Sequence, residues 1–272
     1  MKIAQYLENN RSRLGIVQED KLYPLDFKGD MIQFIKSGKP AEPAENPLSL
    51  DSVKWQAPIA NPSKIIAIGL NYRDHARESK GKIPEIPLLF AKLPSSIIGH
   101  NETISWNRNT TKKVDFEAEL AIVIGKKTYE CTESEALDAV YGYTCANDVS
   151  ARDLQFADGQ WVRGKSLDTF CPLGPWIVTR DELSDPHSLK IQCRLNTQLM
   201  QDSNTDQLIF KVPELVSFLS RHFTLMPGDI ILSGTPSGVG AFRQPSVYMK
   251  DGDTVSVEIE GIGKLVNRCS ER

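Results

Sequence analysis

The run VDFEAELAIVIG (residues 114–125) is apolar enough to form a buried strand, yet two glutamates stand near its start. Alternate side chains of a strand point to the same face, so Glu117 and Glu119 share one face, ~6–7 Å apart along the chain. The opposite face, from Phe116 to Ile124, is continuously apolar. Because burying like charges without a partner is costly, the two glutamates require a nearby cation, and a divalent metal is the simplest one.

The composition is that of an ordinary globular protein. Of 272 residues, 40% are hydrophobic and 25% are charged, which suffices for a sizeable core. The 32 basic and 35 acidic side chains give a net charge of −3, which argues against nucleic acid or an anionic membrane surface as the main partner. No apolar run approaches ~18 residues, so we expect no membrane span.

The cysteines and the N-terminus bear on the compartment. Five cysteines are scattered and never stand at CxxC spacing, which predicts neither a disulfide framework nor a zinc site. Residues 1–8 lack the apolar core or the Arg/Ser-rich pattern of a leader. From these two observations we predict a cytoplasmic protein.

Two parts of unequal size are expected along the chain. Residues 2–24 alternate short β-like runs with polar turns, and Asp30 is placed to cap a short helix that ends before Gly38. A proline-rich stretch, residues 40–62, resembles a semi-rigid linker. We therefore predict a small N-terminal domain, residues 1–56, and a larger domain, residues 57–272.

The larger part contains many strand patterns and few helix patterns. Capped helices are predicted over 72–80, 136–140 and 212–223. Strands are predicted over 64–68, 87–91, 114–124, 141–146, 189–195, 229–233, 254–260 and 264–266. Strands and helices do not alternate regularly, so a doubly wound sheet is not expected. The pattern favours an α+β fold, with a mixed, mostly antiparallel β architecture and short peripheral helices.

A third carboxylate, Asp148, follows the predicted strand 141–146. If that strand lies beside the one that carries Glu117 and Glu119, three carboxylates converge at one end of the sheet. Ligation by oxygen alone suits Mg²⁺, Mn²⁺ or Ca²⁺ better than zinc. In the alternative interpretation, Asp148 caps the next turn and the glutamates pair with Lys112-Lys113.

His75 and Glu78 lie three residues apart on a predicted helix and therefore share a face. A carboxylate beside an imidazole orients the ring and favours its protonated form. A general base that activates water needs both, because it becomes protonated when it takes a proton from water. Flanking glycines, Gly69 and Gly81, would let this segment move as a lid. The alternative is a surface helix with solvated charges.

Two glycine-containing stretches are candidates for binding anions. GQWVRGKS (residues 159–166) matches the phosphate-loop pattern, but no buried strand precedes it and bulky residues stand where amides would wrap phosphate. We therefore retain from it only Lys165, as a cation for an anionic substrate. SGTPSGVG (residues 233–240) offers amides and hydroxyls for a carboxylate, or it forms only a tight turn.

Several of these stretches, in order, resemble motifs of the fumarylacetoacetate hydrolase family. They are GLNYRDH (69–75), the run 114–125, NDVSARD (147–153), GKSLDTF (164–170) and GDIILSGTPSGVG (228–240). The resemblance covers about residues 60–268 and is closest to the subgroup of fumarylacetoacetate-hydrolase-domain-containing protein two. It implies a β-sandwich roll, a homodimer, and a site that binds Mg²⁺, with Mn²⁺ or Ca²⁺ as alternatives.

The resemblance also implies roles for particular residues. Many family members have Arg where this chain has Leu70, which puts a substrate contact there in doubt. By motif match, the metal ligands are Glu117, Glu119 and Asp148, the catalytic residues are His75, Glu78 and Lys165, and the substrate contacts are Arg152, Gln155 and Thr235.

The implied function is that of a metal-dependent enzyme acting on small 2-oxo acids. Cleavage of acylpyruvates or fumarylpyruvate and decarboxylation of oxaloacetate would share an enolate that the metal stabilises. An oxaloacetate keto–enol tautomerase, or an isomerase of the 2-hydroxyhepta-2,4-diene-1,7-dioate type, is the alternative reaction. A non-enzymatic module with a structural Ca²⁺ is the alternative of another class.

Overall fold

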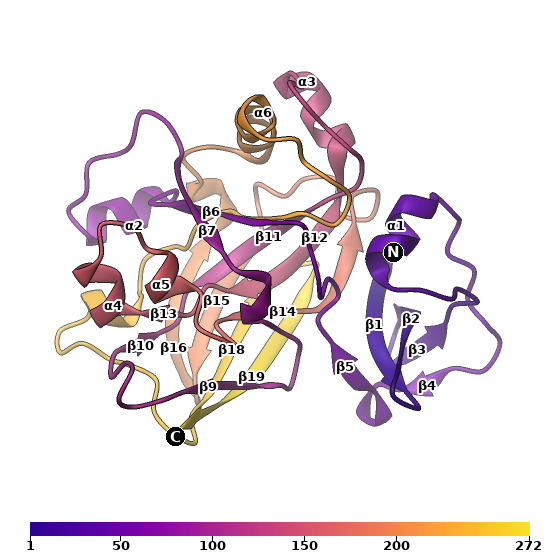
Figure 1. Cartoon of the computed structure of the whole chain (residues 1–272), viewed down its shortest axis with the longest axis horizontal. Coiled ribbons are helices and arrows are strands. Elements are labelled where there is room, and N and C mark those ends of the chain that lie inside the picture. The colour runs from indigo at the N-terminus through magenta and orange to yellow at the C-terminus, as the bar shows by residue number, and fades with distance from the viewer.

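A large mixed sheet forms the centre of the molecule. In the computed structural model, which describes residues 1–272, its strands follow the order β4-β3-β2-β1-β14-β12-β11-β17-β6-β7, with β5 paired to β1 and β8 to β14 (Figure 1). All neighbours are antiparallel except β17–β6 and β14–β8. The strands are β1 (Lys2–Glu8), β2 (Arg11–Gln18), β3 (Lys21–Pro24), β4 (Leu48–Ser49), β5 (Lys54–Gln56), β6 (Ile65–Gly69), β7 (Leu88–Lys92), β8 (Ile97–Ile98), β11 (Ala118–Ile124), β12 (Val140–Asn147), β14 (Cys171–Thr179) and β17 (Ile230–Leu232).

A five-stranded sheet packs against the large one. Its order is β16-β15-β18-β19-β9, and a separate two-stranded pair joins β10 to β13. The main hydrophobic core takes Leu120 and Tyr143 from the large sheet and Ile191, Val257 and Leu265 from the smaller one. This confirms the predicted sandwich-like fold. These strands are β9 (Thr103–Trp106), β10 (Val114–Asp115), β13 (Ser150–Ala151), β15 (Lys190–Leu195), β16 (Gln198–Asn204), β18 (Thr254–Ile259) and β19 (Gly263–Glu271).

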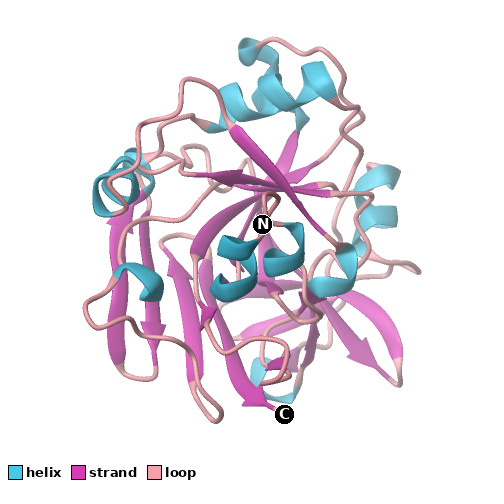
Figure 2. Cartoon of the chain, turned by 60° about the vertical axis from the view of Figure 1, so that its left-hand side comes forward, coloured by secondary structure: helices cyan, strands magenta, loops and turns pink.

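The helices are short and lie around the outside of the sheets (Figure 2). Asp30 forms a capping box with Gln33, and Gly38 ends α1 in the left-handed conformation that glycine favours. The α-helices are α1 (Met31–Ser37), α2 (Arg73–Glu78), α3 (Glu133–Ala136), α4 (Arg152–Ala157), α5 (Val162–Lys165) and α6 (Val212–His222), and the 3₁₀ turns are η1 (Leu50–Ser52), η2 (Pro94–Ser96), η3 (Leu137–Ala139), η4 (Thr205–Gln207) and η5 (Gly240–Phe242). None of these helices has the length and apolarity needed to cross a membrane.

The run 114–125 forms two strands and not the single strand that its composition predicts. The ladder breaks at Phe116 and Glu117, whose N–H groups donate to the side chains of Asp115 (2.9 Å) and Asn147 (3.0 Å). Beyond the break, Ala121 and Val123 pack on a second core, opposite the main one. Both faces of β11 are therefore buried. Glu117 directly precedes the strand and Glu119 is its second residue, so both glutamates lie at its N-terminal end.

The N-terminal strands continue the large sheet and do not form a separate one. β1 pairs with β2 on one side and with β14 on the other, where Ile3 lies opposite Ile177. Ile3 and Leu14 share the second core with Val123 and Leu173. In Figure 1 these strands form the indigo part at one side of the molecule. The boundary at residue 56 remains a prediction.

Candidate active site

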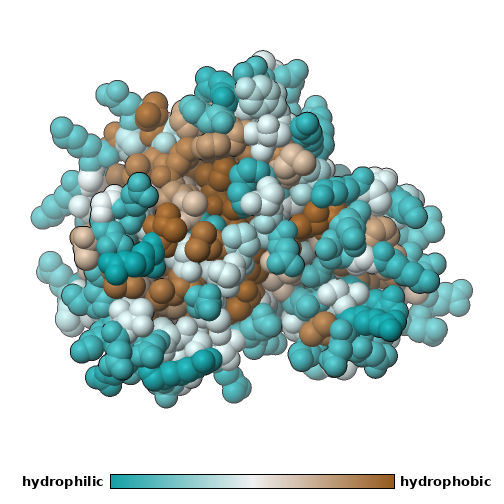
Figure 3. Space-filling view, viewed as in Figure 1, coloured by the Kyte–Doolittle hydropathy of each residue, from teal (hydrophilic) through white to brown (hydrophobic).

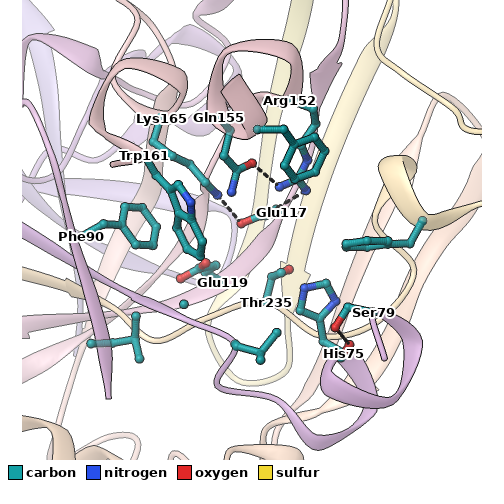
Figure 4. A pocket seen from close by; sticks show the side chains of 15 residues that line it. His75, Ser79, Phe90, Glu117, Glu119, Arg152, Gln155, Trp161, Lys165 and Thr235 are labelled. Atoms are coloured by element: carbon teal, nitrogen blue, oxygen red, sulfur yellow. Dashed lines mark hydrogen bonds and ion pairs between the residues drawn. The ribbon is translucent and has the colours of Figure 1, made fainter. Parts of the chain in front are cut away.

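A pocket opens beside the N-terminal end of β11. On this face of the molecule, apolar side chains gather over β6, β7 and α5 (Figure 3). Figure 4 shows the polar side chains converging within the pocket from separate elements. Its lining residues are Ile68, Gly69, Leu70, His75, Ser79, Phe90, Glu117, Glu119, Arg152, Gln155, Phe156, Trp161, Lys165, Thr235 and Phe242.

Three carboxylates meet beside this pocket, and two of them, Glu117 and Glu119, line it. β11 and β12 are antiparallel neighbours, and Ala118 lies opposite Asn147 in their register. One oxygen from each of Glu117, Glu119 and Asp148 lies within 4.8 Å of the others. All three residues are buried. The structure thus brings together the acidic residues that the sequence places on two strands.

Buried cations hold two of these carboxylates. Lys165 Nζ lies 2.7 Å from Glu117 Oε2 and 2.6 Å from Asp148 Oδ2. Arg152 Nη2 lies 2.6 Å from Glu117 Oε1, and Arg152 Nε donates to Asp115 (2.8 Å). Burial alone would raise the pKa of Glu117, but Lys165 and Arg152 hold that pKa below its ordinary value. These contacts replace the pairing with Lys112-Lys113 considered above.

Glu119 differs from the other two because it contacts no cation. Its one hydrogen bond comes from the Gly234 N–H (2.7 Å), and its side chain is almost fully buried. Burial, together with Asp148 and Glu117, raises the pKa of Glu119 well above its ordinary value. Removing the charge or supplying another cation would relieve this arrangement.

The site fits a divalent metal by its charge and its donors. With Glu119 ionised, as a metal ligand would be, four buried carboxylates (Asp115, Glu117, Glu119 and Asp148) face three buried cations (Lys92, Arg152 and Lys165), which leaves one negative charge, 3 − 4 = −1. The three converging groups are hard oxygen donors, which suit Mg²⁺, Mn²⁺ or Ca²⁺. The acidic cluster is therefore suited to a metal ion, which would rest on Glu117, Glu119 and Asp148.

His75 and Glu78 form the predicted pair at the pocket wall. His75 Nδ1 lies 3.1 Å from Glu78 Oε2, and Glu78 Oε1 accepts from the Gly238 N–H (2.9 Å). Figure 4 shows the imidazole of His75 directed into the pocket, near Thr235. Asp74 on the same helix accepts from Ser203 Oγ (2.5 Å). Helix α2 is thus held by neighbouring segments, unlike the solvated helix considered as the alternative.

The glycine-rich loop directs its amides toward the protein's own carboxylates. The N–H groups of Gly234, Gly238 and Gly240 donate to Glu119, Glu78 and Asp115 respectively. These donors are therefore not free for a substrate carboxylate, which corrects that expectation. Thr235, which lines the pocket, accepts from Gln201 Nε2 (2.8 Å).

The stretch that matches the phosphate-loop pattern positions a cation of the site. Residues 159–166 follow helix α4 and not a strand, and they include α5, which places Lys165 at the carboxylates. Gln155 lines the same wall and accepts from Arg152 Nη1 (2.9 Å). Leu70 also lines the pocket and has a positive φ of 54°.

Sequence reasoning missed several residues that support the site. Asp115 stands inside the run 114–125, but nothing in the strand pattern marks it as the partner of Arg152. Lys92 is buried at the end of an apolar strand. Its position at the end of that apolar run is the only feature of the sequence that indicates its burial. Trp161 and Phe90, whose ring centroids lie 5.3 Å apart, come from segments whose contact no local pattern predicts.

The fold and the site define a small-molecule enzyme, and comparison with known proteins identifies its family. A sequence profile described as fumarylacetoacetate (FAA) hydrolase C-terminal matches residues 64–270. The chain belongs to the fumarylacetoacetate hydrolase family and is an enzyme, which sets aside the non-enzymatic calcium module.

Curated relatives agree with this assignment. The mitochondrial oxaloacetate tautomerase of Xenopus laevis is 47% identical over 98% of this chain and 89% of its own length. That of Rattus norvegicus is 46% identical over 88% of this chain and 79% of its own. The fumarylacetoacetate hydrolase domain-containing protein 2 homolog of Dictyostelium discoideum is 41% identical over 98% of this chain and 96% of its own. The predicted family and subgroup are confirmed.

Solved structures share the fold over the whole chain. The fumarylacetoacetate hydrolase of Exiguobacterium antarcticum has a TM-score of 0.91 and 38% identity, with full coverage of both chains. The maleylpyruvate hydrolase of Sphingobium sp. SYK-6, solved with manganese(II) and pyruvate, has a TM-score of 0.81 and 30% identity, covering 100% of this chain and 99% of its own.

The comparisons contradict the predicted cytoplasmic location. The tautomerases of Xenopus laevis and Rattus norvegicus are mitochondrial. Scattered free cysteines are compatible with any reducing compartment, so they did not distinguish the cytoplasm from another such compartment. The expectation of a cytoplasmic protein was wrong.

Proposed function

We propose that this enzyme interconverts the keto and enol forms of oxaloacetate with a Mg²⁺ ion held by Glu117, Glu119 and Asp148. The observation that carries the proposal is the placement of an oriented histidine in the pocket that Glu117 and Glu119 line, two of the three converging carboxylates. Relatives with 46% and 47% identity carry out this reaction. A divalent cation in the site would supply electrophilic stabilisation of the charge that develops on the 2-oxo oxygen.

The chain's own cations would orient the substrate. Arg152 and Lys165 face the pocket and are buried, so a carboxylate of oxaloacetate would meet positive charge at its base. Gln155 and Thr235 add neutral polar groups to the same wall. Oxaloacetate is a small dianion, and a pocket that combines these groups with a metal suits it.

His75 would move the proton. Because Nδ1 faces Glu78, Nε2 is the nitrogen that is free to meet the substrate. In ketonisation, the enol oxygen at C2 loses a proton and C3 gains one. A single imidazole can take the proton from the enol oxygen and deliver a proton to C3. Glu78, itself fixed by Gly238, keeps the ring in place for both transfers.

A second candidate reaction is hydrolytic cleavage of acylpyruvates or maleylpyruvate-type substrates. The maleylpyruvate hydrolase with the same fold supports it, as does the His75–Glu78 pair. Here Nε2 would take a proton from water, the water oxygen would join the C4 carbonyl, and the C3–C4 bond would break. The released C3 carbon would take a proton to give pyruvate.

One set of assays separates the two reactions. Enol loss is followed by ultraviolet absorbance with oxaloacetate, and pyruvate release is followed by a coupled dehydrogenase with acetylpyruvate, fumarylpyruvate and oxaloacetate. We expect Mg²⁺-dependent enol loss that is faster than any pyruvate release. His75→Ala should reduce it by about 10²–10⁴-fold, whereas the exposed-histidine control His222→Ala should not. Pyruvate release from acetylpyruvate or fumarylpyruvate that exceeds enol loss would favour the hydrolase, and pyruvate release from oxaloacetate would indicate decarboxylation. Full activity of His75→Ala would remove the proton role.

We also propose a homodimer. The edge strand β7 and its flanks expose large apolar side chains, Ile83, Ile86, Leu88 and Leu93, which is unusual for a monomer surface. Light scattering coupled to size exclusion measures the mass directly. A mass near twice 30.4 kDa supports the proposal, and a mass near 30.4 kDa at micromolar concentration contradicts it.

A further inference from the structure

Lys92 is a buried cation near the site that does not line the pocket. It ends β7, and its side chain is 0% exposed, whereas Arg152 and Lys165 both face the pocket. A buried ammonium is retained only where its partners compensate the loss of water. The partners of Lys92 therefore indicate what it does.

Those partners come from two separate segments of the site. Lys92 Nζ donates to Asp148 Oδ1 (2.6 Å) and lies 3.4 Å from the carbonyl oxygen of Val149. It also donates to the backbone carbonyl of Lys165, at the end of α5. One ammonium thus joins the segment after β12 to the helix that carries Lys165.

The oxygens of the site carboxylates are divided among the cations in a regular way. Glu117 gives Oε1 to Arg152 and Oε2 to Lys165, and Asp148 gives Oδ1 to Lys92 and Oδ2 to Lys165. Glu117 and Asp148 therefore each have one oxygen that contacts a cation of its own, while their other oxygens both contact Lys165. Lys92 thus contacts one oxygen of Asp148 in the same way that Arg152 contacts one oxygen of Glu117.

We propose that Lys92 is a positioning residue, which orients Asp148 for metal binding and fixes the main chain at Lys165. The terminal torsion of an aspartate is broad, so an ion pair on Oδ1 helps to select the orientation in which Oδ2 shares Lys165 with Glu117. The inference rests on the proposed metal site. It assigns no contact with substrate to Lys92.

The test measures metal affinity and not only activity. Lys92→Met keeps the length of the side chain and removes its charge. Calorimetric titration of the EDTA-treated, dialysed protein with Mn²⁺ should show binding about 10–100-fold weaker than in the wild type. At saturating Mn²⁺ the KM for oxaloacetate should change less than the Mn²⁺ affinity, because Lys92 acts on the substrate only through the main chain of Lys165.

Lys64→Met is the matched control. Lys64 also pairs with a buried carboxylate, Asp229, but Asp229 is not one of the three converging carboxylates. Both variants should lose thermal stability, whereas only Lys92→Met should lose metal affinity. Lys92→Gln, which keeps one donor, serves if Lys92→Met does not fold and should give an intermediate affinity.

Each outcome decides something. Mn²⁺ affinity within about twofold of wild type in a folded Lys92 variant would overturn the positioning role. Equal losses of affinity in Lys64→Met would overturn it too, since general destabilisation would then explain the effect. A wild-type protein that binds no Mn²⁺ would instead refute the proposed metal site on which the inference rests.

Discussion

Glu119 is the side chain on which the proposed metal site depends most. Glu117 and Asp148 each contact two cations, but Glu119 has only the Gly234 N–H. Its raised pKa has a consequence for the metal-free protein, because the folded state keeps a proton that the unfolded state releases above about pH 4.5. Stability from this group is therefore lost as the pH rises.

Substituting Glu119 by Gln separates its charge from its shape. Glu119→Gln keeps an acceptor for the Gly234 N–H and removes the carboxylate, so metal affinity and activity should fall by about 100-fold or more. Without metal, the variant should be more stable than wild type at pH 8 and lose less stability between pH 5 and pH 8. The exposed strand residue Glu258 provides the control, Glu258→Gln. Undiminished metal binding by Glu119→Gln would contradict the ligand role.

His100 gives the protein a second pH dependence, remote from the pocket. Its Nδ1 accepts from the Val266 N–H (3.1 Å), and burial lowers the pKa of His100 to about 4. The unfolded state therefore takes up a proton below about pH 6.5 that the folded state refuses, and stability falls as the pH falls.

His100→Asn replaces Nδ1 by an oxygen acceptor that does not titrate in this range. Wild type should lose about 1–2 kcal/mol of unfolding free energy between pH 7 and pH 5 through this residue. The variant should lose correspondingly less, as measured by urea denaturation at each pH. Some dependence will remain, because burial also lowers the pKa of His187. Identical pH profiles would exclude His100 as the source.

At the scale of elements, α2 depends on its contacts for its position. A helix of six residues is not stable by itself, and α2 is held by Asp74 to Ser203, by Glu78 to Gly238 and by Arg73 to the Leu208 carbonyl (2.9 Å). All three anchoring residues lie on the helix that carries His75. The segment that was expected to move as a lid is therefore anchored in this structure by specific hydrogen bonds.

Asp74→Ala should loosen α2 without altering the metal ligands. Amide exchange over residues 73–81 should become about tenfold faster or more, and the KM for oxaloacetate should rise while Mn²⁺ affinity stays unchanged. Asp206→Ala is the control, since Asp206 accepts only from its neighbour Gln207. Unchanged exchange in Asp74→Ala would show that Asp74 does not anchor the helix.

Elements whose sequence carries a local pattern were predictable, and those set by distant contacts were not. The periodicity at Glu117 and Glu119 and the spacing of His75 and Glu78 identified two halves of the site. Strand β14 went unpredicted because Pro172 and Pro175 lack N–H groups, which usually excludes a central strand. The ladder with β12 shifts register between Tyr143 and Cys145, opposite residues 174–178, and so accommodates Pro175.

At the scale of the whole molecule, the large sheet joins the N-terminal strands to the catalytic part. No short-range pattern indicates that β1 pairs with β14, because about 175 residues separate the partners. A proline-rich stretch suggested a linker, yet β5 within it pairs with β1 and returns the chain to the sheet. The proposed metal site also depends on contacts between distant segments. Lys92 and Asp115 support it through such contacts, which no short-range pattern indicates.

This continuity predicts how the molecule unfolds. Differential scanning calorimetry should show one cooperative transition, because Ile3 and Leu14 share a core with Val123 and Leu173. Ile3→Ala should lower the midpoint of that single transition, through an expected loss of about 2–5 kcal/mol. Two separate transitions, with only the first affected by Ile3→Ala, would show instead that residues 1–56 fold independently.

The central claim is that a divalent metal on Glu117, Glu119 and Asp148 is required for turnover of a 2-oxo acid. The most direct measurement is the initial rate of oxaloacetate enol loss by EDTA-treated, dialysed protein, before and after Mg²⁺ is restored, against Mg²⁺ in buffer without protein. We predict a rate at background without metal and full recovery with Mg²⁺. Metal-free protein that turns over oxaloacetate as fast as the Mg²⁺-restored enzyme would contradict the account.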